Sequence, residues 1–102
     1  MDALTIAEGV LRNPTAPYHE HLVAEHCMKV ASDLGLACER DAAGNVLVRH
    51  ESHGGDTSAP LVLVAHLDHP GFVVDTADGG RASLTFHGGL TAEHAREGAP
   101  IW

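Results

Sequence analysis

The sequence is poor in aromatic residues, in cations and in cysteine, and each shortage excludes a class of protein. Only four residues are aromatic, so a core must be built from Leu, Val, Ile and Ala. The formal net charge of −8 argues against nucleic acid and anionic membranes as partners. Cys27 and Cys38 are too few for a disulfide framework and suit small buried thiols of a reducing, cytoplasmic compartment. No run reaches the roughly 18 apolar residues of a membrane span, and "MDALTIAEGV" lacks the basic region of a signal peptide.

What is present predicts one small α/β domain. The chain has 102 residues and a hydrophobic fraction of 44%, which suits a globular protein. The hydrophobic period changes from 3.6 to 2 along the chain, so helices come first and strands follow. We expect the front portion of a mixed β-sheet flanked by helices. The predicted helices cover residues 3–12 and 18–34, and the predicted strands cover 36–40, 46–50, 61–65, 71–76 and 81–87.

The stretch "LVLVAHLDHPGFVV" carries the clearest chemical signal. Leu61–Ala65 shows no polar alternation, which predicts a central strand covered on both faces. His66 and Asp68 follow at its end, where α/β sheets place ligands, and residues i and i+2 of an extended chain face the same side. A metal-bound histidine commonly donates its second N–H to a carboxylate. The pattern therefore favours His66 as a metal ligand with Asp68 beside it, although a His-x-Asp pair by itself also occurs by chance.

The other histidines have simpler interpretations. His26 falls on the apolar stripe of the second predicted helix and is interpreted as a core residue. His19 and His21 are two positions apart, which on a helix does not place them on one face. His87 precedes "GG" and closes a predicted strand.

Four segments resemble one family when they are taken in order. "AHLDHPGFVV" is similar to "AH-x-D-E-x-GF-x-V" of the co-catalytic zinc aminopeptidases of the glutamyl-aminopeptidase, or tetrahedral aminopeptidase, family. "PTAPYHE" resembles the family's "P-S-G-Y-E", "RDAAGNVLVRH" resembles "D-x-x-G-N-L-I-A", and "DGGRASLTFHGGL" resembles "G-x-L-x-F-x-x-x-GG". The resemblance runs from about residue 4 to residue 99 and covers only the first portion of a family member.

This resemblance implies a metallo-aminopeptidase with a peptide substrate. His66 would bind one of two zinc or cobalt ions, and Asp68 would be the catalytic carboxylate that orients His66. The bond between Asp68 and His69 would be cis. Residues 1–87 would form the N-terminal part of the catalytic domain, and residues 88–102 would begin an inserted β-domain. The complete enzyme would be cytoplasmic and could form a homo-oligomer.

The chain also departs from the family pattern. His69 replaces the usual Glu and is either an extra polar contact at the site or a loop histidine. The family's remaining ligands and its general base follow the inserted domain, so we expect the 102-residue chain to be inactive. A strand-like Ile101 and Trp102 at the end suggest the front part of a longer protein, with exposed apolar surface and marginal stability here. The alternatives are an amidohydrolase or deacylase of the same superfamily, and a non-catalytic remnant or binding module.

Overall fold

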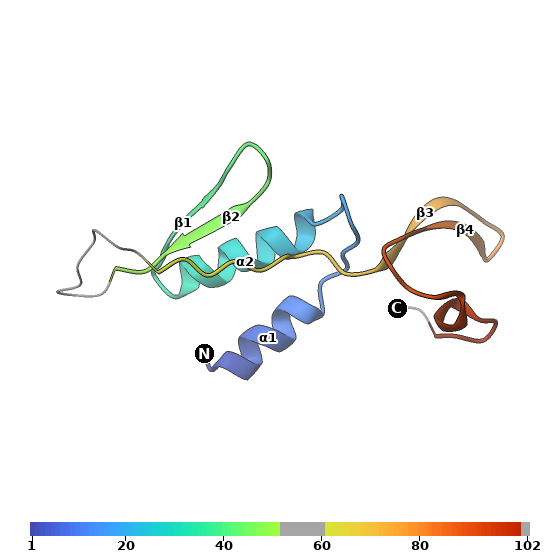
Figure 1. Cartoon of the computed structure of the whole chain (residues 1–102), viewed down its shortest axis with the longest axis horizontal. Helices are drawn as coiled ribbons and strands as arrows, with labels where there is room; N and C mark the ends of the chain where they lie inside the picture. The colour runs from blue at the N-terminus through green and yellow to red at the C-terminus, as the bar shows by residue number, and fades with distance from the viewer. Residues whose placement is uncertain (52–60, 101–102) are drawn as a thin grey trace.

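A computed structural model describes residues 1–51 and 61–100 (Figure 1). Two helices come first, and two β-hairpins and a 3-10 helix follow, so the predicted α/β class is confirmed. Residues 52–60, predicted as a polar loop, lie outside the described residues, as do Ile101 and Trp102. Across the described ranges, no helix combines the length and apolar character that a bilayer crossing requires.

Helix α1 (Ala3–Leu11) begins at a side-chain cap. The Asp2 carboxylate accepts hydrogen bonds from the backbone N–H and the hydroxyl of Thr5, both at 2.9 Å. An acidic N-cap satisfies one of the free N–H groups of the first turn and complements the helix dipole. At the other end, the Asn13 side chain donates to the Gly9 carbonyl at 2.7 Å. Both ends of this short helix therefore depend on polar side chains next to it.

Helix α2 (His21–Asp33) starts three residues later than the predicted Tyr18. Tyr18 adopts a φ of 71°, in the left-handed region, and its N–H donates to the Glu20 carboxylate at 2.8 Å. A left-handed residue interrupts helical geometry, so the helix cannot include it. At the other end, Gly35 has a φ of 69° and ends the helix as its sequence position predicts.

The hairpin of β1 (Ala37–Arg40) and β2 (Val46–Arg49) lies beside α2 (Figure 1). Its strands are antiparallel, with Cys38 opposite Val48. The Asp41 carboxylate holds the turn by accepting from the Ala43 N–H at 2.9 Å and from the Asn45 N–H and side-chain amide, both at 2.8 Å. The Asn45 side chain is the largest cause that lowers the pKa of Asp41, since these bonds favour the ionised form.

The second hairpin joins β3 (Gly71–Asp78) to β4 (Arg81–His87). The bounds of β4 agree with the prediction, and β3 continues two residues further than expected. Phe72 and Phe86 face each other across the hairpin with ring centres 5.2 Å apart. A register shift lies between Val74 and Thr76, where the Thr85 hydroxyl donates to the Asp75 carboxylate at 2.8 Å. That residues 88–102 open an inserted domain stays a prediction.

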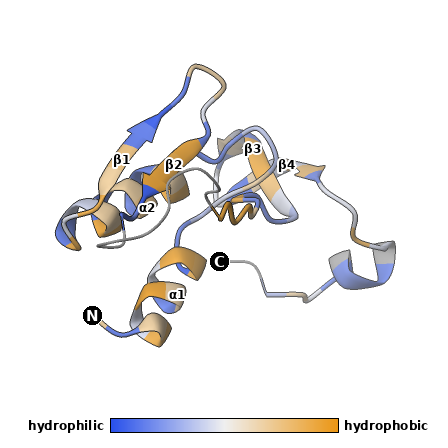
Figure 2. Ribbon diagram, turned by 60° about the vertical axis from the view of Figure 1, so that its left-hand side comes forward, coloured by the Kyte–Doolittle hydropathy of each residue, from blue (hydrophilic) through white to orange (hydrophobic). Residues whose placement is uncertain are grey.

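The buried core is small and centres on α2. Its fully buried hydrophobic residues are Ala16, Val23, Ala24 and Ala31. The hydrophobic positions along α1, β2 and β3 can be followed in Figure 2. The Cα radius of gyration is 17.6 Å, whereas a compact domain of this length has about 13 Å. The described chain is therefore elongated, with the two hairpins at different ends (Figure 1).

The predicted strand over residues 61–65 is wrong for the chain in this structure. Leu61 to Val64 are not in a β-strand, and they are 72% to 91% exposed. A strand that is apolar on both faces needs hydrogen-bonding neighbours and two covering layers. The described residues supply neither, because their strands pair as two separate hairpins.

Candidate functional site

His66 and Asp68 lie on the irregular segment that leads into β3. The His66 Nδ1 atom is 2.8 Å from the Asp68 backbone oxygen and 3.0 Å from the carboxylate oxygen Oδ1. A carbonyl oxygen and an ionised carboxylate only accept hydrogen bonds. The Nδ1 atom must therefore carry the proton, which leaves the Nε2 lone pair free when the imidazole is neutral. This tautomer is the one that binds a metal through Nε2.

The pair is open to solvent. The side chain of His66 is 77% exposed and that of Asp68 is 37% exposed. In so exposed a position, the charge attraction between the two groups adds little to folding stability. The contact is therefore important for the orientation and the tautomer of the His66 ring. The Nε2 side of this ring is accessible to solvent.

His69 lies close to the pair. Its ring centre is 6.2 Å from that of His66, with the ring planes 65° apart. The peptide bond between Asp68 and His69 is trans, so the expected cis bond is wrong for this structure. The two interpretations of His69 stay open.

The segment that carries the pair is tied to the loop before α2. The Thr15 hydroxyl donates to the Leu67 carbonyl at 3.3 Å. A Cβ added to Gly71 would lie 2.7 Å from the Thr15 carbonyl oxygen, and one added to Gly88 would lie 2.8 Å from Pro70. These close approaches need glycine. Sequence reasoning missed Thr15 as a positioning residue, although its motif "PTAPYHE" was the signal that marked this loop.

The surroundings of His66 suit its role as one ligand of a metal site. A neutral imidazole with its second nitrogen bonded to a carboxylate is a common zinc-ligand arrangement. A catalytic zinc site requires about three protein ligands. In the part of the chain that the structure describes, no three His, Cys, Asp or Glu side chains gather closely enough to hold a metal ion. His66 fits as one ligand, and the described residues do not complete the set.

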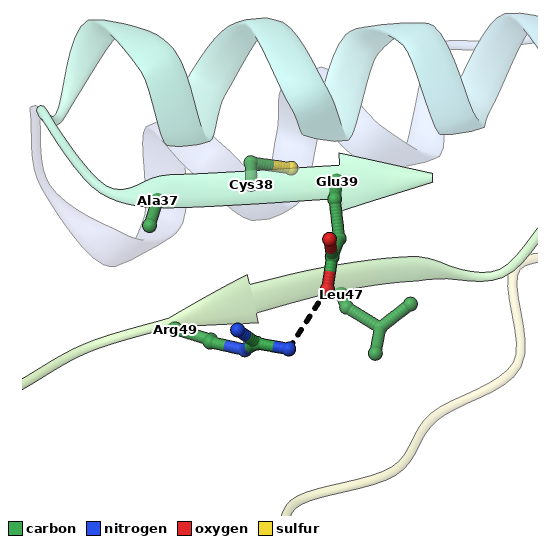
Figure 3. Close-up of a pocket in the computed structure, with 5 residues that line it drawn as sticks. All are labelled: Ala37, Cys38, Glu39, Leu47 and Arg49. Atoms are coloured by element: carbon green, nitrogen blue, oxygen red, sulfur yellow. Dashed lines mark hydrogen bonds and ion pairs between the residues drawn. The ribbon is translucent and has the colours of Figure 1, made fainter. Parts of the chain in front are cut away.

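Two hollows lie elsewhere on the molecule. One, of about 100 Å³, lies over the β1–β2 hairpin, where Arg49 and Glu39 form an ion pair at 2.8 Å (Figure 3). The other, of about 290 Å³, lies between α1 and α2 and includes His26 and Gly9 in its wall. Neither is lined by His66 or Asp68.

Comparison with known proteins gives one informative match. The chain is 41% identical over 56 residues to the cytosol non-specific dipeptidase of Escherichia coli (strain K12). The matched part is 54% of this chain and 12% of the dipeptidase. No family model matches the chain, and no solved structure matches it. The match supports a relationship to peptidases, and so to hydrolases. It does not show that the chain belongs to the aminopeptidase family that the motifs resemble.

Proposed function

We propose that this chain is part of a metal-dependent peptidase, with His66 as one metal ligand and Asp68 as the carboxylate that orients it. The observation that carries the proposal is the bond from His66 Nδ1 to Asp68, which leaves Nε2 free. The match to a peptidase supports the same reaction class. The trans bond after Asp68 does not weaken this role, because the contact needs only the Asp68 oxygens.

Each residue has one task in this proposal. When bound, divalent ions (two of zinc or cobalt in the complete enzyme) would supply Lewis acidity and lower the pKa of a bound water. His66 would hold one of them through Nε2. Asp68 would hold the proton on Nδ1 and so keep Nε2 available to the ion. Thr15 fixes the backbone between them through the Leu67 carbonyl.

The proposed substrate is a peptide with a free N-terminus, as the aminopeptidase-like motifs suggest. A second candidate substrate is a dipeptide, which the match to a non-specific dipeptidase favours. Comparing a dipeptide with a longer peptide that has the same first residue separates the two. The proposed setting is the cytoplasm, and the complete enzyme is proposed to form a homo-oligomer.

The 102-residue chain by itself is expected to be inactive, because His66 alone cannot hold a catalytic metal ion. The test is an assay of the purified chain with zinc or cobalt on a dipeptide and on an aminoacyl chromogenic substrate. Turnover that a chelator and His66→Ala both abolish would overturn this expectation.

The residue roles are tested in a chimera. A segment of this chain that contains His50, His66 and Asp68 replaces the corresponding segment of the E. coli dipeptidase, and dipeptide hydrolysis is measured. Removing a carboxylate that orients a metal-binding histidine typically costs about 10–100-fold in metal affinity or activity, so we expect that loss for Asp68→Ala and a larger one for His66→Ala. His50→Gln in the same chimera is the matched control for losing an exposed histidine, and it should leave the activity unchanged.

The chimera is informative only when it folds, so its circular dichroism and melting temperature are compared with those of the parent dipeptidase. A folded and active chimera that keeps full activity after His66→Ala would refute the metal-ligand role. Loss of activity with metal content unchanged would indicate a role other than metal binding.

A further inference from the structure

Three ring side chains gather where the loop before α2 meets the end of β4. The rings of His19 and His87 have centres 6.0 Å apart with planes at 61°. The ring of Tyr18 lies edge-on to His87 at 6.5 Å. Tyr18 and His19 are exposed, and His87 is half-buried. None of these residues belongs to the proposed peptidase site.

The spacing of the two imidazoles suits a shared metal ion. Zinc–nitrogen bonds are about 2.0–2.1 Å, which puts the ring centres of two histidines on one tetrahedral ion about 5 Å apart. The observed 6.0 Å is wider, and a small movement of the exposed His19 side chain would bring both rings to one ion. Within residues 1–51 and 61–100, neither ring takes part in a hydrogen bond, whereas His66 and His94 do. A neutral imidazole offers the lone pair of its unprotonated nitrogen to a ligand.

The backbone is bent to bring His19 to this place. Tyr18 has the left-handed φ of 71° that a non-glycine residue rarely adopts. Two hydrogen bonds of 2.8 Å hold the bend, from the Tyr18 N–H to Glu20 and from the His19 N–H to the Ala16 carbonyl. Strained residues of this kind cluster at ligand sites. The bend explains how a residue before α2 reaches a strand end distant in sequence.

We propose that His19 and His87 form a two-histidine site for a divalent transition-metal ion such as zinc, nickel or copper. Imidazole ligands favour these ions over magnesium and calcium. In the described ranges no third His, Cys, Asp or Glu completes a cluster, so water fills the other positions. The ion would link the β3–β4 hairpin to the helical part of the chain. This inference does not rest on the peptidase function.

The test is a zinc chloride titration of the 102-residue chain, followed by long-range ¹H–¹⁵N spectra of the histidine rings. The ring nitrogens of His19 and His87 should shift together with one dissociation constant. His19→Gln or His87→Gln should each weaken that affinity by about tenfold or more, since losing a ligand costs at least as much as losing a second-shell group. Zinc should also raise the unfolding midpoint of the unmodified chain, by mass action.

Two matched variants separate this site from other histidines. His50→Gln removes an exposed imidazole elsewhere, and His66→Gln removes the proposed peptidase ligand; both should leave the response of His19 and His87 unchanged. The proposal is overturned when the two rings respond independently or do not respond. It is also overturned when the folded His87→Gln chain, checked by its amide spectrum, shows an unchanged response at His19.

Discussion

The Nδ1 atom of His66 lies within hydrogen-bonding distance of two oxygens of one residue, the Asp68 carbonyl at 2.8 Å and its carboxylate at 3.0 Å. The backbone oxygen remains when the side chain is removed. We therefore expect His66 to be mainly the Nδ1–H tautomer at pH 8, and Asp68→Ala to shift part of the population to Nε2–H. The ¹⁵N chemical shifts of the ring measure both. A dominant Nε2–H form in the unmodified chain would contradict the assignment.

The close packing of α1 on α2 depends on Gly9. A Cβ at this position would lie 2.7 Å from the Nε2 atom of His26, a buried atom that has no hydrogen-bond partner within the described residues. Ala is the better helix former by up to about 1 kcal/mol, but overpacking costs about 1–3 kcal/mol. We expect Gly9→Ala to lower the free energy of unfolding, as measured by urea denaturation.

The double variant Gly9→Ala/His26→Ala provides the control for this packing. It removes the ring that the new methyl group would meet, so the added cost of Gly9→Ala should disappear in the His26→Ala background. Gly9→Ala that stabilises the chain in both backgrounds would show that helix propensity outweighs the contact.

The cap of α1 should make the helix sensitive to acid. The backbone N–H of Thr5 is the largest cause that lowers the pKa of Asp2, followed by the Thr5 hydroxyl. Because the folded pKa is below the unfolded one, the stabilisation is present above about pH 4 and is lost as the pH falls through the folded value. We expect helicity to decrease in that window and Asp2→Asn to reduce the dependence. Circular dichroism at 222 nm measures it, and an identical acid profile for Asp2→Asn would count against the cap.

Cys27 should react slowly with alkylating reagents. Burial is the main cause that raises the pKa of its thiol, and the nearby Cys38 adds to the rise. Less thiolate is then present at pH 8, and the thiolate is the reactive form. In a Cys38→Ser chain, iodoacetamide should modify Cys27 more slowly in native buffer than in urea. Equal rates, after correction for the solvent, would show that burial does not protect this thiol.

Much of the fold could be predicted from the sequence because it is local. The period of 3.6 predicted a helix that ends at residue 34, one residue beyond the observed end of α2, and the period of 2 predicted β4 with its observed bounds. The β1–β2 turn follows from Asp41, Gly44 and Asn45, whose conformational preferences and side-chain bonds act within five residues. Even the His66–Asp68 contact is local, since the two residues are only two positions apart in the sequence.

What the sequence could not decide depends on partners that are distant along the chain. Its apolar run over 61–65 predicted a strand, but strand formation needs a neighbour to complete the hydrogen bonds, and the described residues provide none. The start of α2 was displaced by the bend at Tyr18, and the bond after Asp68 is trans. The approach of Thr15 to Leu67 and of His19 to His87 spans more than 50 residues. Only the tertiary structure brings such groups together, because packing and not local preference fixes their separation.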